Sequence, residues 1–225
     1  MPVDIENYWR IKNELGEAVT LVAVSKTKSI EDILELYNLG HRDFGENYVQ
    51  ELVDKEAVLP KDIRWHFIGT LQTNKVKKIA PFIHLIHAVE SLSLLKKIDK
   101  HGNKWNRVID CLFQLHIADE ETKHGMYENE VEEGLQQLSS GEMPNVRING
   151  LMGMATLTPD LNKIRNEFNY LKKVYVKNSL PVTEYSNFTL LSMGMSSDYK
   201  IAVGEGSNMV RIGSLIFGER NNPQV

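Results

Sequence analysis

Short apolar runs recur along the chain and alternate with longer segments in which apolar residues recur every three or four positions. The short runs lie at 21–26, 43–48, 65–69, 85–90, 108–117, 148–155, 190–195 and 209–213. Helical spacing is found at 30–39, 92–101, 128–138 and 161–176. Strands that alternate with helices pair in parallel through crossover connections. Because the runs are apolar on both faces, we predict an α/β protein with a covered parallel sheet.

The number of runs favours one parallel architecture over another. Eight strands close a (β/α)8 TIM barrel, and a chain of 225 residues lies near the lower end of its usual size. A doubly wound open sheet is the alternative, but its dinucleotide-binding form has G-x-G-x-x-G after the first strand, where this chain has Ser-Lys-Thr-Lys-Ser at 25–29. We therefore predict one barrel domain over residues 1–225, with an extra N-terminal helix.

Composition limits the partners and the compartment. The net charge is -4 and the basic residues are scattered, so no nucleic-acid partner is indicated. A single cysteine, Cys111, excludes an internal disulfide and fits a reducing compartment. No apolar run approaches the ~18 residues of a membrane span, and the N-terminus does not resemble a signal peptide. We predict a cytoplasmic protein without a membrane partner, as a monomer, with a dimer as the alternative.

The segment LVAVSKTKSIEDIL places a lysine at the carboxyl end of a predicted barrel strand. Active sites gather at the carboxyl ends of barrel strands, and Lys26 follows the first run. Ser29 predicts the start of a helix directly afterwards. Strand alternation puts Lys26 on the inner face with Val22 and Val24, where lost hydration lowers the pKa of the amine and makes it a nucleophile toward a carbonyl. The alternative is that Lys26 or Lys28 extends into solvent at a strand end.

The last two runs predict a site for an anion. LLSMGMSSDYKIAV places Ser196 and Ser197 before a short helical segment, and GSNMVRIGSLIFG ends its strand at Gly213 and Ser214. The loops after strands seven and eight commonly bind phosphate in barrels. Either motif alone fits ordinary caps and turns. Together, opposite an inward lysine, they fit an aldehyde that carries a phosphate, and pyridoxal 5′-phosphate (PLP) is such a molecule.

Arg211 has the same strand parity as Gly213, so it is predicted to point into the same barrel mouth. A salt bridge to Glu205 or Glu219 is the alternative. The sequence does not decide between them.

Six motifs, VAVSKTKS, FGENYVQE, WHFIGTLQTNK, GLMGMAT, SMGMSSDYKIAV and GSNMVRIGSLIFG, together resemble the YggS/PROSC family. Its members are the PLP homeostasis proteins, and the resemblance runs from about Leu21 to Gly218. It implies a barrel of the alanine-racemase N-terminal-domain type (PLP fold type III). It also implies that PLP is held as a Schiff base on Lys26.

The resemblance also implies roles for further residues. It implies that Arg211 faces the pyridine nitrogen of the cofactor and that Asn47 and Met154 line its pocket. The phosphate-binding positions implied in the same way are Ser196, Ser197, Gly213 and Ser214. The chain departs from the family at Thr70, where many relatives have histidine or proline, and at Ser214, which is often threonine.

The same resemblance bears on catalysis. Most PLP reactions need a protonated ring nitrogen, and an arginine such as Arg211 keeps its own proton, which leaves the electron sink weak. Alanine racemases add a β-domain that supplies a tyrosine, whereas only ERNNPQV follows IFG here. Tyr48 and Tyr199 are the nearest replacements. We expect PLP buffering and delivery to apo-PLP enzymes rather than catalysis, with a PLP-dependent amino-acid racemase or other weak PLP enzyme as the alternative.

Histidines at His84 and His87 raise the possibility of a metal site. They lack the H-E-x-x-H pattern of zinc proteases, and a spacing of three within a strand places the two rings on opposite faces. We predict no metal site, and we interpret His66, His87 and His116 as hydrogen-bonded core histidines.

Overall fold

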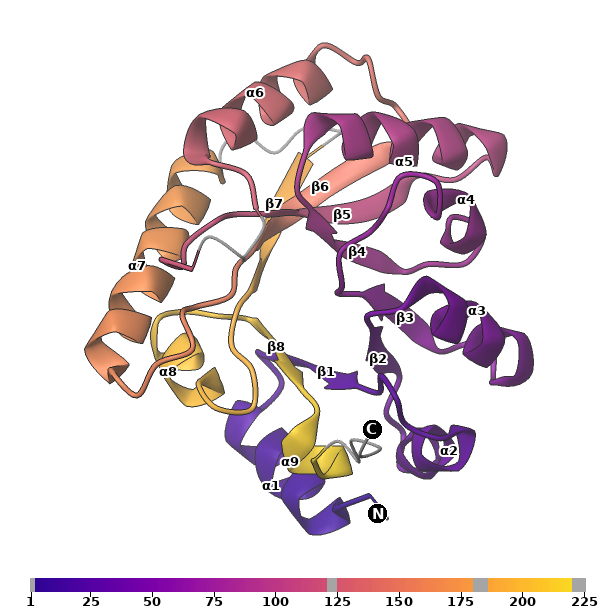
Figure 1. Ribbon diagram of the computed structural model, residues 1–225, viewed down its shortest axis with the longest axis vertical. Helices are drawn as coiled ribbons and strands as arrows, with labels where there is room; N and C mark the ends of the chain where they lie inside the picture. The colour runs from indigo at the N-terminus through magenta and orange to yellow at the C-terminus, as the bar shows by residue number, and fades with distance from the viewer. Residues whose placement is uncertain (1–2, 121–124, 180–185, 220–225) are drawn as a thin grey trace.

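The computed structural model describes residues 3–120, 125–179 and 186–219. Its strands form one closed barrel in the order β1-β2-β3-β4-β5-β6-β7-β8, with every neighbouring pair parallel. Helices surround this barrel on the outside (Figure 1). The predicted (β/α)8 architecture is confirmed.

All eight predicted strands are present. They are β1 (Thr20–Val24), β2 (Asp43–Glu46), β3 (Arg64–Phe67), β4 (Leu85–Val89), β5 (Ile109–Gln114), β6 (Val146–Met152), β7 (Ser186–Ser192) and β8 (Met209–Ile212). The apolar runs extend past the observed strand ends on the carboxyl side. Residues 25–26, 153–155 and 193–195 are examples, and they lie in the loops that follow β1, β6 and β7.

The helices of the described ranges include the four that were predicted by spacing. They are α1 (Ile5–Leu15), α2 (Ile30–Asn38), α3 (Val49–Val58), α4 (Val76–Ile79), α5 (Leu92–Lys104), α6 (Glu128–Ser139), α7 (Leu161–Asn178), α8 (Tyr199–Gly204) and α9 (Ser214–Phe217). Ser29 caps α2 as predicted, because its hydroxyl accepts from the backbone N–H of Asp32 and the Asp32 carboxylate accepts from Ser29 N–H.

The extra N-terminal helix packs on the outside of the barrel beside α9 (Figure 1). Helix α1 buries Tyr8, Ile11 and Leu15, and the N–H of Asp4 donates to the carbonyl of Ile216 over 2.8 Å. Beneath it, β1 pairs with β8 and closes the barrel. The beginning and the end of the described chain are therefore neighbours.

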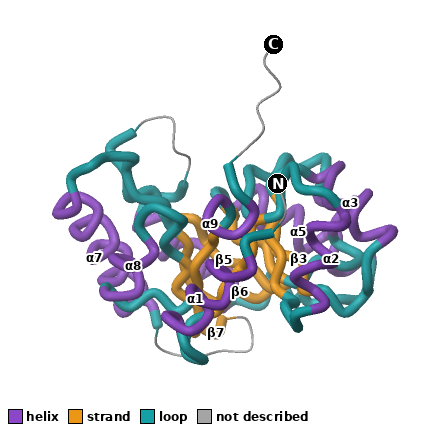
Figure 2. Tube along the Cα trace, turned by 90° about the horizontal axis from the view of Figure 1, so that it is seen from below, coloured by secondary structure: helices purple, strands orange, loops and turns teal. Residues whose placement is uncertain are grey.

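Two apolar regions hold the barrel together. The larger lies between strands and helices, while a smaller cluster fills the barrel interior. The interior cluster consists of Val22, Leu85, Ala88, Leu112, Met152 and Met209. Seen from the side, the strands form a central layer with helices around them (Figure 2). The packed interior places any ligand site at a mouth of the barrel rather than within it.

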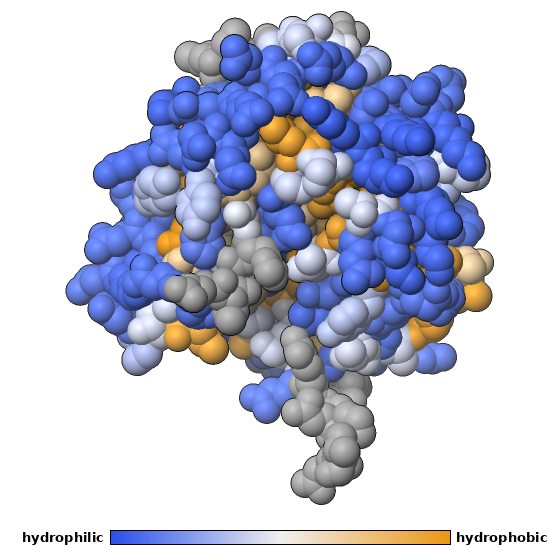
Figure 3. All heavy atoms as spheres, turned by 45° about the horizontal axis from the view of Figure 1, so that its top comes forward, coloured by the Kyte–Doolittle hydropathy of each residue, from blue (hydrophilic) through white to orange (hydrophobic). Residues whose placement is uncertain are grey.

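Polar side chains cover most of the visible exterior, and apolar residues show mainly in small groups and in a hollow of the face drawn in Figure 3. None of the helices in the described residues is both long enough and apolar enough to cross a membrane.

Candidate functional site

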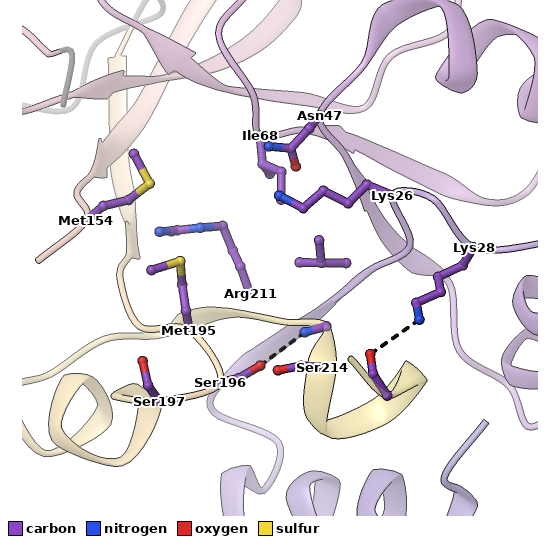
Figure 4. A pocket seen from close by; sticks show the side chains of 13 residues that line it. Lys26, Lys28, Asn47, Ile68, Met154, Met195, Ser196, Ser197, Arg211 and Ser214 are labelled. Carbon is purple, nitrogen blue, oxygen red and sulfur yellow. Dashed lines mark hydrogen bonds between the residues drawn. The ribbon is translucent and has the colours of Figure 1, made fainter. Parts of the chain in front are cut away.

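A cavity of about 360 Å³ lies at the carboxyl ends of the strands. It is lined by Val24, Lys26, Lys28, Asn47, Ile68, Met154, Met195, Ser196, Ser197, Arg211, Gly213, Ser214 and Gly218. All eight residues that the sequence singled out are among them. Figure 4 shows Lys26 and Asn47 on one side, Ser196 and Ser214 on the other, and Arg211 between them.

The turn after β1 directs Lys26 into this cavity. Val24 and Lys26 both line it, while the hydroxyl of Ser25 points the other way and donates to Glu46 Oε1 over 2.6 Å. Thr27 has a φ of 63°, in the left-handed region that β-branched residues rarely adopt. Its N–H donates to the Glu51 carboxylate over 2.6 Å, and this bond holds the strained conformation. The predicted inward direction of the lysine is confirmed.

A buried ion cluster supports the turn from behind. Lys55 Nζ donates to Glu46 Oε1, Glu51 Oε1 and the carbonyl of Ser25, each over 2.7 Å. Burial raises the pKa of Glu46, and the charge of Lys55 opposes that shift. Sequence reasoning missed this cluster. The i,i+4 spacing of Glu51 and Lys55 was a signal, but such pairs usually lie on exposed helix faces.

Lys28 also lines the cavity, but its amine binds backbone carbonyl oxygens. Nζ donates to the carbonyl oxygens of Phe217 (2.7 Å), Gly218 (3.3 Å) and Glu219 (3.3 Å). These bonds satisfy backbone acceptors at the end of α9. The two lysines of one turn therefore have different surroundings, and Lys28 acts as a helix cap.

Hydroxyls and backbone N–H groups face the cavity from the loops after β7 and β8. The N–H of Gly213 donates to Ser196 Oγ over 3.4 Å, which joins the two loops. Gly194 has a φ of +98°, and a Cβ there would lie 2.6 Å from the Cβ of Ala202. A Cβ on Gly213 would lie 3.1 Å from the carbonyl oxygen of Val24. The backbone of β1 therefore leaves little room for a side chain at Gly213.

Arg211 is almost fully buried at the base of the cavity. Its Nη1 donates to the carbonyl (2.9 Å) and the hydroxyl (2.6 Å) of Ser192, and Nη2 donates to the carbonyl of Gly153 (3.1 Å). Burial lowers the pKa of the guanidinium to about 10, so the group is still charged at neutral pH. The alternative of a salt bridge to Glu205 is wrong, because Glu205 pairs with Arg165 over 3.1 Å.

One buried polar atom of the cavity wall has no partner within the described part of the chain, and a ligand could supply one. Asn47 Oδ1 is buried and has no hydrogen-bond partner among the described residues. Such an atom is costly in a protein unless a ligand or water satisfies it. Ile68, Met154 and Met195 give the cavity apolar walls suited to a flat ring. A lysine, three hydroxyls, an arginine and apolar walls together fit PLP.

His66 and His87 are buried in the barrel and His84 is exposed, and one prediction about these histidines is wrong. The rings of His84 and His87 do not take opposite faces, because both contact His66, with ring centroids 5.3 and 5.2 Å away. His84 precedes β4, so strand alternation does not apply to it. His66 and His87 are hydrogen-bonded core residues, as predicted. Ligand atoms of Asp43, His66 and His84 lie within 4.8 Å of one another, but the Arg64 guanidinium already binds both oxygens of Asp43.

Neither tyrosine proposed as a replacement acid/base lines the cavity. Tyr48 is exposed and precedes α3, while the hydroxyl of Tyr199 donates to Glu14 Oε2 over 2.6 Å and connects α8 to α1. The described cavity lining holds no tyrosine, histidine or carboxylate side chain.

Comparison with known proteins agrees with this geometry. The model of the alanine racemase N-terminal domain family matches residues 5–221. A protein of Aquifex aeolicus named pyridoxal phosphate homeostasis protein is 41% identical over 203 residues, which cover 89% of this chain and 86% of that protein. The chain belongs to the family of pyridoxal phosphate homeostasis proteins. This confirms the family that the six motifs indicated.

Solved structures of one relative show the same fold. PipY of Synechococcus elongatus, solved without PLP, is 33% identical and superposes with a TM-score of 0.89 over 95% of this chain and 99% of its own. The same protein has also been solved with PLP bound, and that structure superposes with a TM-score of 0.85 over the same shares. The alanine-racemase type of barrel is thereby confirmed.

Proposed function

We propose that the protein binds PLP reversibly through a Schiff base on Lys26 and acts in the homeostasis of this cofactor. The observation that carries the proposal is that one cavity gathers Lys26, Arg211 and three serine hydroxyls at the barrel mouth. Family membership and the PLP-bound relative support it. Residues 1–225 act as one domain in the cytoplasm, as a monomer, and supply PLP to apo-PLP enzymes.

Each part of the cavity has a role in this proposal. The Lys26 amine would hold PLP through a C=N bond to its aldehyde carbon, with release of one water. Ser196, Ser197, Gly213 and Ser214 would bind the phosphate through hydroxyls and backbone N–H groups. Arg211 would donate to the ring nitrogen, and Asn47 and Met154 would flank the ring.

We further propose that the protein is not an amino-acid racemase or other PLP enzyme. Reaction at an amino-acid α-carbon needs a positioned acid/base beside the cofactor. Tyr199 is bound to Glu14 outside the cavity, and Arg211 is a poor proton donor to the ring because its pKa remains about 10. The chemistry that remains for these residues is capture and release of an aldehyde.

A borohydride trap tests the binding mode. Reduction of the protein with PLP should fix the cofactor on Lys26, as located by mass spectrometry of the digested protein. Lys26→Ala should give no adduct and lose the near-visible absorption of the Schiff base. Lys28→Ala is the matched control, and it should keep the adduct although the cap of α9 is weakened. An adduct on Lys28 in the native protein would contradict the assignment.

A separate assay tests the absence of catalysis. The PLP-loaded protein is incubated with a panel of L-amino acids, and D-amino acids and keto acids are measured. We expect turnover no greater than that of Lys26→Ala. Turnover well above this background would favour the racemase alternative and leave the Schiff base itself intact.

A further inference from the structure

A chain of hydrogen bonds runs through the barrel interior from Arg211 to Asp43. Arg211 Nη1 lies 2.6 Å from Ser192 Oγ, and that oxygen lies 3.1 Å from His87 Nδ1. His87 Nε2 lies 2.9 Å from His66 Nδ1, and His66 Nε2 lies 3.1 Å from Asp43 Oδ1. All five residues are buried, with exposed fractions between 0 and 9%. The chain crosses β8, β7, β4, β3 and β2.

The chemistry of the two ends fixes the direction of the two outer bonds. An arginine only donates, so Ser192 Oγ accepts from Arg211. An ionised carboxylate only accepts, so His66 Nε2 carries a proton and donates to Asp43. Asp43 is ionised, because hydrogen bonds from Arg64 and His66 outweigh the effect of burial and hold its pKa well below the usual range.

The tautomers of the two imidazoles follow when His66 carries a single proton, on Nε2. Its Nδ1 then accepts, so His87 donates from Nε2. Burial lowers the pKa of His87 well below its ordinary value, so this ring is neutral and its Nδ1 accepts the hydroxyl proton of Ser192. Each donor thus points away from Arg211 and toward Asp43. A chain of one direction is polarised cooperatively by the cation at one end and the anion at the other.

We infer that Ser192, His87 and His66 are positioning residues for Arg211, and that their one-way chain fixes which guanidinium N–H groups face the cofactor cavity. The contacts to Ser192 and Gly153 take three N–H groups and leave Nε–H and one Nη2–H for other acceptors. The inference rests on the proposed function in one respect, namely that the acceptor for Arg211 in the cavity is the ring nitrogen of PLP. It assigns a binding role to residues that do not line the cavity.

The protonation pattern is tested first in the protein without PLP. Long-range ¹H–¹⁵N spectra of histidine-labelled protein at pH 7 should show a protonated Nε2 and a bare Nδ1 on both His66 and His87. A proton on Nδ1 of either ring would overturn the inference. This result does not depend on PLP binding, so it separates the two proposals.

The effect on the cofactor is tested with Ser192→Ala. The variant should weaken PLP affinity about tenfold, since a buried donor loses its acceptor. It should also move the ¹⁵N signal of the ring nitrogen in labelled PLP, which a merely structural role would not do. The matched control is Ser207→Ala, which removes a buried hydroxyl bonded to the carbonyls of Leu191, Met193 and Met209. It should leave the ring signal unchanged.

The outcomes are distinct. Ser192→Ala with native affinity and an unmoved ring signal would contradict the positioning role while PLP binding stands. Failure of the native protein to bind PLP would contradict the proposed function, and the histidine spectra would still decide whether the chain exists.

Discussion

Two buried cations of this barrel have opposite surroundings. Lys55 lies behind the β1 turn, where two carboxylates, Glu46 and Glu51, bind its amine. Arg211 lies at the base of the cavity, where its hydrogen bonds within the described residues go to neutral oxygens. Their exposed fractions, 5% and 4%, are nearly equal. Burial alone therefore does not distinguish them, but their partners do.

The difference indicates which cation serves structure and which serves a ligand. The charge of Lys55 is neutralised in the folded chain. Burial lowers the pKa of the Arg211 guanidinium to about 10, so keeping its charge inside the protein carries an energetic cost. A fold that keeps such a cost usually recovers it when a ligand supplies the missing acceptor. Four predictions test this contrast, from the largest expected effect to the smallest.

Lys55→Met should lower the free energy of unfolding by about 3–5 kcal/mol, because it leaves the carboxylate of Glu46 buried without its cation. Denaturant titration measures the loss. The double variant Lys55→Met/Glu46→Gln should recover part of it. A loss below about 1 kcal/mol in the single variant would show that the ion cluster does not stabilise the fold.

Arg211→Met should act mainly on the cofactor. It removes a donor to the bound ring, so PLP affinity should fall by about 10- to 100-fold. Without PLP its unfolding free energy should change less than that of Lys55→Met, because the burial cost of the charge disappears together with three hydrogen bonds. A PLP titration and a denaturant titration measure the two effects. Equal destabilisation of the two variants would refute the contrast.

His41 is a buried histidine whose ring is neutral at pH 7 in the folded protein. Burial lowers its pKa from 6.5 to about 4, so the folded state binds fewer protons than the unfolded state. The stability of the neutral ring is present above pH 6.5 and is lost as the pH falls toward 4, by about 2 kcal/mol between pH 7 and pH 5. His41→Gln should reduce the pH dependence of unfolding by this amount. The same slope in both proteins would contradict the shift.

Lys61→Met should have the smallest effect. Its amine lies 2.7 Å from Glu56 Oε1, as close as Lys55 lies to its partners, but the side chain is 64% exposed. Exposed pairs contribute about 0–1 kcal/mol. Denaturant titrations of Lys61→Met and Lys55→Met therefore separate the effect of burial on stability from the effect of pairing. A loss as large as that of Lys55→Met would mean that the distance, not burial, sets the cost.

Strands were predictable here because parallel strands covered on both sides are continuous apolar runs. Their carboxyl ends were not, because Met193 and Ala155 are apolar and buried although they lie in the loops after β7 and β6. Lys26 was predictable from its place after β1, since position along a barrel strand fixes the direction of a side chain.

What surrounds each site residue was not predictable. The acceptors of Arg211 come from β7 and from the loop after β6, and Lys55 meets Ser25 across thirty positions of sequence. No local period encodes such contacts. His84 shows the same limit, since it lies just before β4, where strand alternation does not fix the direction of its ring.

The seam between β1 and β8 has a consequence for synthesis of the protein. Lys26 follows the first strand, whereas Arg211, Gly213 and Ser214 come from the last, and the two strands pair directly. A growing chain on the ribosome therefore exposes the Lys26 amine long before the residues of β8 are made. On the binding mode proposed above, the nascent polypeptide becomes competent for the vitamin only after the final strand has left the exit tunnel and closed the ring.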